Sequence, residues 1–373
     1  MLEHGQTSSP KRLASPPIGL VDLSMPPSLM IINVYTFIML FAAAVSLVIG
    51  AIILPLSYKL VTNWEKENNS EMKGRLERTG YLVLLIACVI LAVRMASWPF
   101  FYFTLRSYVP EVPGAMCMFG VTQIFPHTVW FLQIIKPIAF FAMGGWFLLY
   151  YIDNQTNTSP LAVRKFALLA VISIVILADS IGDLYYFIRM KPLMTVSCCA
   201  TFYDIPVRAS AMIPRAVLGG HYEKNLLPVY YTTNLTLISL LAYMLWQGIV
   251  GLNTLWKKVA ISVAITLGAI NALVVILSFF EVISPRLMQL PYHHCMYCFI
   301  GNGLVPDAPI ILGLFILGTY GIGWILLLTL ICRGYAEKDI EVIVDGTLKR
   351  LLGFSILCLL GAVLMVSTHL IIL

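Results

Sequence analysis

Charged residues are scarce in this sequence. Only 11% of its 373 residues are Asp, Glu, Lys or Arg, whereas about a quarter of the residues in a soluble domain are charged. Hydrophobic residues make up 60% of the chain, and its mean hydropathy is +0.88. This composition excludes an ordinary soluble protein and predicts an integral membrane protein in contact with the lipid bilayer. The net charge of +6 is then interpreted as a determinant of topology, with no role in binding nucleic acid.

The usual motifs of soluble enzymes are also missing. No Walker, GxGxxG, HExxH or GxSxG pattern lies between elements that would make it functional. No ATPase domain is present, so any transport by this chain would need an ion gradient or a partner protein. Whether the chain is an enzyme stays open at this level.

Apolar residues occur in blocks of twenty or more, which is long enough to cross about 30 Å of hydrocarbon as a helix. A β-barrel would show an alternation over about ten residues per strand, and that alternation is absent here. We therefore predict an all-α polytopic membrane protein with eight transmembrane helices arranged as hairpins. The predicted spans are residues 29–58, 81–104, 128–152, 166–188, 228–251, 259–283, 309–332 and 351–373.

The first 28 residues differ from the rest of the chain. They are rich in Ser and Pro and have too little apolar surface to fold alone, so we predict a flexible tail at 1–28 and one transmembrane domain at 29–373. The first apolar run is about twice as long as the core of a signal peptide, and we expect it to be retained as a helix.

The connections between the spans fall into two sets. One set is short and basic, and it covers residues 61–80, 153–165, 252–258 and 333–350. The other set is longer, is rich in Pro and Gly, and covers 105–127, 189–227 and 284–308. The positive-inside rule places the basic set in the cytoplasm, with the second set and both termini outside. We expect a bacterial inner (plasma) membrane. In either orientation, parity places the three long loops on one face.

Five cysteines lie in these three loops. Cys295 and Cys298 form a CxxC motif that contains Met296 and follows His293 and His294. Thiolates at this spacing suit one metal ion or one redox disulfide.

The other loop cysteines are Cys117, which lies between Met116 and Met118, and the adjacent pair Cys198 and Cys199. Cross-loop disulfides are an alternative to a metal for all five, although an odd count leaves one thiol over. The remaining cysteines lie in or at the ends of apolar spans, where we expect them to act as packing residues: Cys88, Cys332 and Cys358.

Ionisable residues also lie inside predicted spans, where they are costly unless they pair or line a pathway. They are Arg94, Lys136, Asp179, Asp183 and Glu281. At 1.5 Å per residue, Arg94 and Asp179 lie at matching depths, about 14 to 15 Å from the cysteine-side ends of their helices. Two interpretations remain open: a structural ion pair between Arg94 and Asp179, or a polar pocket continuous with the cysteine loops.

A faint internal repeat accompanies the hairpin pattern. Residues 117–120 (Cys-Met-Phe-Gly) resemble residues 298–301 (Cys-Phe-Ile-Gly), and each tetrapeptide lies in a loop between two spans. Gene duplication is one hypothesis for this pattern, and proteins built from repeats place their sites where the halves meet.

Three classes of function fit these features. The first, which we favour, is an outward-facing Cys/His/Met site that binds, traffics or transports a soft metal ion, with Cu(I) as the expected metal. The second is a membrane thiol-disulfide oxidoreductase that exchanges electrons with quinone. The third is a structural subunit of a respiratory assembly. The first two classes imply a periplasmic partner protein that carries metal or thiols, and the sequence does not define the oligomeric state.

Overall fold

The structure is a computed structural model that describes residues 33–64, 70–156, 159–191, 196, 197, 199–205, 208–248, 255–301, 303–332 and 338–372. The predicted tail and Cys198 lie outside these residues. Within the described part of the chain, every regular element is helical.

Eight of the helices formed by the described residues are long. They are α1 (Val34–Asn63), α2 (Ser70–Ser107), α4 (Pro126–Asp153), α5 (Ala162–Arg189), α8 (Glu223–Trp246), α9 (Leu255–Ser278), α12 (Ala308–Ile331) and α13 (Lys338–Ile372). Among the described residues, seven helices are long and apolar enough to cross a membrane, and α8 is the long helix that is not among them. The all-helical class predicted from composition is confirmed.

Two helices, α2 and α13, begin far earlier than the apolar pattern predicts. The predicted spans start at residues 81 and 351, whereas α2 begins at Ser70 and α13 at Lys338. The added turns contain Glu, Lys and Arg, which favour helix and whose charges interrupt the apolar block. The apolar block therefore marks only the part of each helix that can lie in hydrocarbon.

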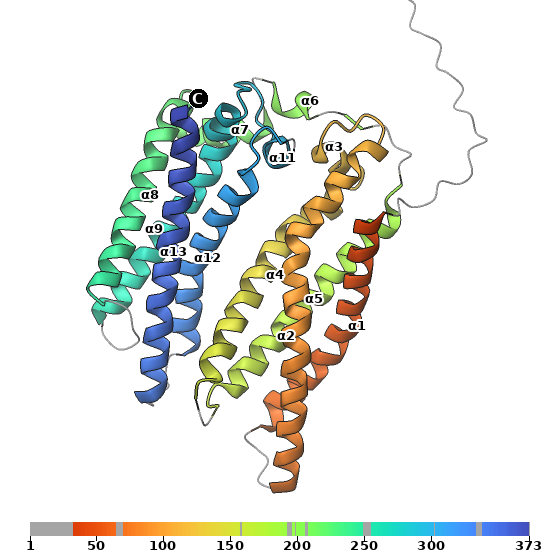
Figure 1. Ribbon diagram of the computed structural model, residues 1–373, viewed down its shortest axis with the longest axis vertical. Coiled ribbons are helices and arrows are strands. Elements are labelled where there is room, and N and C mark those ends of the chain that lie inside the picture. The colour runs from red at the N-terminus through yellow and green to blue at the C-terminus, as the bar shows by residue number, and fades with distance from the viewer. Residues whose placement is uncertain are drawn as a thin grey trace, which may run out of the picture.

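The long helices form two groups of four, which Figure 1 shows side by side. In the first group, α1 and α4 each contact both α2 and α5. In the second group, α8 and α12 each contact both α9 and α13. The order of neighbours around the two groups is the same when α1, α2, α4 and α5 are matched to α8, α9, α12 and α13. A duplicated four-helix unit would give this arrangement.

The sequences of matched helices support the same correspondence. Residues 145–149 of α4 read Gly-Trp-Phe-Leu-Leu, and residues 323–327 of α12 read Gly-Trp-Ile-Leu-Leu. These two helices also contact each other across the boundary between the groups. If the two groups are duplicated units, a pseudo-twofold axis relates them, and matched helices such as α4 and α12 are expected to touch where it passes. This axis would run along the helices, because α1 and α8 start at the same end of the molecule (Figure 1).

Large side chains fill spaces left by glycine at this boundary. A Cβ on Gly144 would lie 2.3 Å from Trp324, and one on Gly323 would lie 2.7 Å from Phe141. The Trp324 indole donates a 2.8 Å hydrogen bond to the Phe141 carbonyl, and the two rings are stacked. Small residues let helices approach closely in a membrane, where lipid removes the hydrophobic drive for helix association.

The connections at one end of the molecule contain short helices. They are η1 (Val109–Glu111), α3 (Met118–Thr122), α6 (Ala200–Tyr203), α7 (Ala209–Leu218), the π-helix η2 (Phe279–Ile283), α10 (Ser284–Leu287) and α11 (Met296–Gly301). Figure 1 shows α3, α6, α7 and α11 together at the same end of both groups. The three cysteine loops therefore share one face, as parity predicts.

We predict that Gly144→Val destabilises the contact between the two groups. The valine side chain would overlap the Trp324 ring, and such overpacking costs about 1 to 3 kcal/mol. The melting temperature of the purified protein in detergent should fall. Gly313→Val on α12 is the control, because nothing lies within 4 Å of a Cβ at that position. Equal melting temperatures for the two variants would contradict the close contact.

Candidate metal centre

Four cysteines from the three loops meet at one point. The Sγ atoms of Cys117, Cys199, Cys295 and Cys298 all lie within 4.8 Å of one another, and all four residues are buried. The Cys199 and Cys298 Sγ atoms are 3.6 Å apart, far beyond the roughly 2.05 Å of a disulfide bond. These four residues, called here the four-cysteine cluster, are therefore brought together as thiols.

Short helices fix the position of each cysteine. Cys117 is the extended residue before α3, and its carbonyl accepts from Gly120. Cys199 precedes α6, and its carbonyl accepts from Phe202 and Tyr203. Cys295 precedes α11 in the same way, and Cys298 lies in the first turn of that helix. The CxxC spacing thus puts both of its sulfur atoms on one end of a helix.

The first two loops are joined by their backbones. Val196 N–H donates a 3.2 Å hydrogen bond to the Pro113 carbonyl. Gly114 has a φ of +83°, and a Cβ there would lie 2.6 Å from the Val196 carbonyl oxygen. Only glycine tolerates both this backbone conformation and this approach. The contact brings Cys199 alongside Cys117.

The first and third loops meet through α3 and α11. A Cβ on Gly301 would lie 2.6 Å from the Met118 Cε atom, so this methionine fills the space that glycine leaves. Gly120 is in the equivalent position of α3, and a Cβ on it would lie 2.9 Å from Ala115. The glycines that end the two similar tetrapeptides therefore both serve close packing.

The pKa values of Cys117 and Cys298 are shifted in opposite directions. The pKa of Cys117 lies below its usual value, because the neighbouring thiols, Cys199 first, donate hydrogen bonds to its sulfur. The pKa of Cys298 lies above its usual value, because its proton is held toward Cys117 and because it is buried. Protons shared in this way limit the negative charge of the cluster. A cation bound among them would allow all four thiols to be thiolates together.

The two histidines of the third loop have different partners. His293 lies beside the cluster, with Nε2 3.9 Å from the Cys199 sulfur. The His294 Nδ1 instead lies 3.0 Å from the Phe280 carbonyl, which belongs to the π-helix η2. Burial lowers the pKa of His294, so its imidazole is held neutral. Met116 is 74% exposed and Met296 is half-buried.

A groove of about 530 Å³ borders the cluster. Its lining includes Phe119, Tyr203 and Tyr297, each of which is within four residues of a cluster cysteine. Gln133 on α4 donates a hydrogen bond to the Tyr297 hydroxyl inside it. Burial raises the pKa of Tyr203 to about 12, so its hydroxyl stays protonated.

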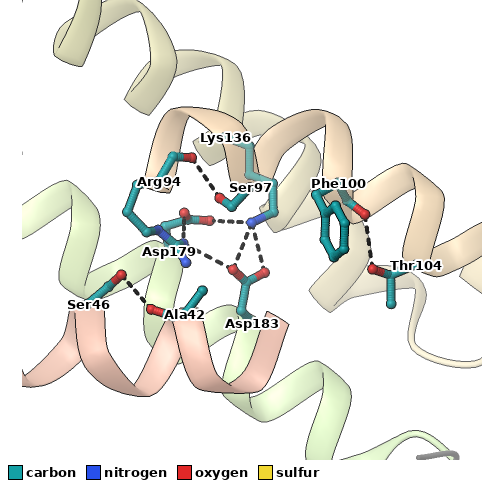
Figure 2. Close-up of polar contacts among 9 residues, drawn as sticks. All are labelled: Ala42, Ser46, Arg94, Ser97, Phe100, Thr104, Lys136, Asp179 and Asp183. Carbon is teal, nitrogen blue, oxygen red and sulfur yellow. Dashed lines mark hydrogen bonds and ion pairs between the residues drawn. The ribbon is translucent and has the colours of Figure 1, made fainter. Parts of the chain in front are cut away.

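The buried charges of the first helix group form one network. Arg94 on α2 pairs with Asp179 and lies 3.0 Å from Asp183, and Lys136 on α4 lies 3.0 Å from Asp179 and 2.8 Å from Asp183. Figure 2 shows the four side chains pointing at one another from three helices. Their side chains are at most 3% exposed. Two cations and two anions balance, so the Arg94–Asp179 ion pair, one of the two interpretations left open by the sequence, is present within a larger set of buried charges.

Glu281 belongs to a different contact. It is buried in η2 and pairs with Arg208, which precedes α7 and also lies 3.4 Å from Glu223 on α8. The sequence analysis compares only ionisable residues inside predicted spans. Arg208 lies in the predicted loop 189–227, so it is not recognised there as a partner of Glu281. The structure therefore separates Glu281 from the network of Arg94, Lys136, Asp179 and Asp183.

Asp204 was not identified from the sequence. Its Oδ1 lies 2.6 Å from the Nδ1 atom of His293. The only sign of this residue in the sequence is a carboxylate five residues after Cys199 in the same loop, and its importance is seen only when the loops are known to meet.

No protein-family model, curated protein or solved structure matches this chain.

We predict a compensating pattern for the buried network. Arg94→Gln and Asp179→Asn each leave an unbalanced buried charge and should each cost about 3 to 5 kcal/mol. The double variant restores neutrality and should recover most of the loss. Melting temperatures in detergent across the three variants test this, and additive losses would show that the charges do not act as one network.

Proposed function

We propose that this chain is an integral membrane protein whose four-cysteine cluster binds one metal ion. The observation that carries the proposal is the convergence of four buried Sγ atoms from three loops within 4.8 Å. Buried sulfur atoms crowded in this way, without disulfide bonds between them, suit metal ligation. The long helices, α8 included, are proposed to cross the bilayer, because α8 runs beside α9 and α13.

The geometry favours a different metal from the one expected from the sequence. Four thiolates around Zn²⁺, at a Zn–S distance of about 2.3 Å, place their sulfur atoms about 3.8 Å apart, and the Cys199 and Cys298 sulfur atoms are 3.6 Å apart. Tetrahedral sites of four sulfur ligands are typical of zinc or iron. The case for Cu(I) depends on methionine and histidine as well, but Met116 is exposed and the Nδ1 atom of His294 faces the Phe280 carbonyl. We place Zn²⁺ or iron first and Cu(I) second.

Burial indicates what the ion would do. A closed site with four protein ligands is the structural type, whereas catalytic sites keep a position for water or substrate. Here the ligands come from both helix groups and from the segment between them. The metal would therefore hold the loops of the two groups together, on the face that we propose to be outside because the basic residues concentrate in the connections at the other end.

We predict that the purified protein contains one zinc or iron ion per chain. Inductively coupled plasma mass spectrometry measures the metal content. Cys298→Ser should lose it, because a hydroxyl replaces a thiolate ligand. Cys358→Ser is the matched control, since that buried cysteine lies on α13 away from the cluster. Metal-free wild-type protein that is folded and binds none of the three metals when supplied would overturn the proposal.

A second candidate function is favoured by the groove beside the cluster. Cys199 and Cys298 are the thiol pair at 3.6 Å, and the groove is lined by aromatic rings and by Gln133. A quinone bound there could take two electrons and two protons from the two thiols. The products would be one Cys199 to Cys298 disulfide and one quinol, which balances the reaction.

We predict that the two functions separate in one experiment. The reduced, metal-free protein is mixed with a short-chain quinone, and quinol is followed by absorbance while thiols are counted. A redox enzyme would give one quinol for each pair of thiols lost, and Cys199→Ser would abolish it. A metal centre would show no turnover, and its thiols would be protected by added Zn²⁺.

A further inference from the structure

His293 lies between the four-cysteine cluster and the surface. Its Nε2 atom is 3.9 Å from the Cys199 sulfur, and its Nδ1 atom is 2.6 Å from Asp204. The cluster cysteines are at most 3% exposed, whereas the side chains of His293 and Asp204 are 14% and 35% exposed. The order from inside to outside is therefore sulfur, imidazole and carboxylate.

The Asp204 carboxylate determines how His293 can react. An ionised carboxylate only accepts hydrogen bonds, so the Nδ1 atom of His293 carries a proton and donates it. In a neutral ring, the lone pair is then on Nε2, which is the atom that faces the cluster. A carboxylate behind an imidazole orients histidine ligands in this way in many metal sites. His293 therefore has the arrangement of a ligand, although four cysteines already complete a tetrahedral set.

We propose that His293, held by Asp204, is the loading ligand of the metal centre: it binds the ion first and passes it to Cys199 and the other cysteines. The proposal rests on the proposed metal function. Its cargo is a divalent cation that accepts both nitrogen and sulfur, such as Zn²⁺ or Fe²⁺. Since His293 is absent from the final ligand set, it changes the rate of exchange and leaves the number of bound ions unaltered.

The neighbouring histidine supplies a matched control. His294 is next in sequence and is also buried in the loop, but its Nδ1 faces the Phe280 carbonyl. Its side chain is outside the group of four sulfur atoms. Replacing it perturbs the same loop without removing a group aimed at Cys199. A general effect of loop packing would appear in both histidine variants, and a ligand effect only in His293.

The test measures zinc exchange in the full-length protein purified in detergent. Zinc uptake and zinc transfer to a coloured chelator are followed for the wild type, His293→Gln, Asp204→Asn and His294→Gln. We expect all four to bind the same amount of zinc. His293→Gln should slow uptake and release alike, on the order of tenfold. Asp204→Asn should slow both less, and His294→Gln should match the wild type.

Chemical rescue separates a ligand from a structural residue. In His293→Gly, imidazole added to the buffer should restore part of the uptake rate, which a purely structural side chain would not allow. Wild-type exchange rates in His293→Gln overturn the inference and leave the metal centre standing. Loss of bound zinc in His293→Gln, with zinc retained in His294→Gln, also overturns it, because His293 would then be an equilibrium ligand. If the wild type binds iron and no zinc, the same exchange is measured with Fe²⁺; a wild type that binds none of zinc, iron and Cu(I) removes the proposed function itself.

Discussion

The contact between α4 and α12 is the constraint on which the rest of the structure depends. Trp324 occupies the space left by Gly144, and Phe141 occupies the space left by Gly323, so the two helix groups are held at a fixed separation. Cys117 follows α2 of one group, and Cys295 and Cys298 precede α12 of the other. Their sulfur atoms can meet only because these helices are locked together. The cluster is thus a product of helix packing.

The two halves share a plan but differ in polarity. In the first group, four buried charges join α2, α4 and α5. In the second group, a neutral pair of amides, Asn234 on α8 and Asn271 on α9, forms a 3.1 Å hydrogen bond between helices. A buried amide is less costly than a buried charge and also less demanding of its neighbours. The buried charges of the second group, Glu281 and Arg208, lie at its cysteine-loop end, so the two groups differ in how their long helices are joined by polar side chains.

The sequence predicts some of this structure because some of it depends on composition alone. Long apolar blocks predict helices, and an even number of helices between loops predicts that Cys117, Cys199 and the CxxC motif share one face. The starts of α2 and α13 are missed because charged residues interrupt the apolar pattern before each block, although the helix continues through them. The difference between His293 and His294 is missed because adjacent residues in a loop have side-chain directions determined by distant elements. His293 faces Asp204, and His294 faces the Phe280 carbonyl of η2.

The order of the cluster cysteines along the chain has a consequence for biosynthesis. Cys117 is made when two long helices exist, Cys199 after four, and Cys298 only after six. Because α12 and α13 follow Cys298 in the chain, the second helix group is completed only after all four cysteines have been made, and the four sulfur atoms cannot meet before α12 packs against α4. During that interval the earlier cysteines are separated from their later partners, and an oxidant or a stray metal could trap them in the wrong pairing. The four-cysteine cluster therefore forms only if Cys117 and Cys199 remain reduced until α12 is in place.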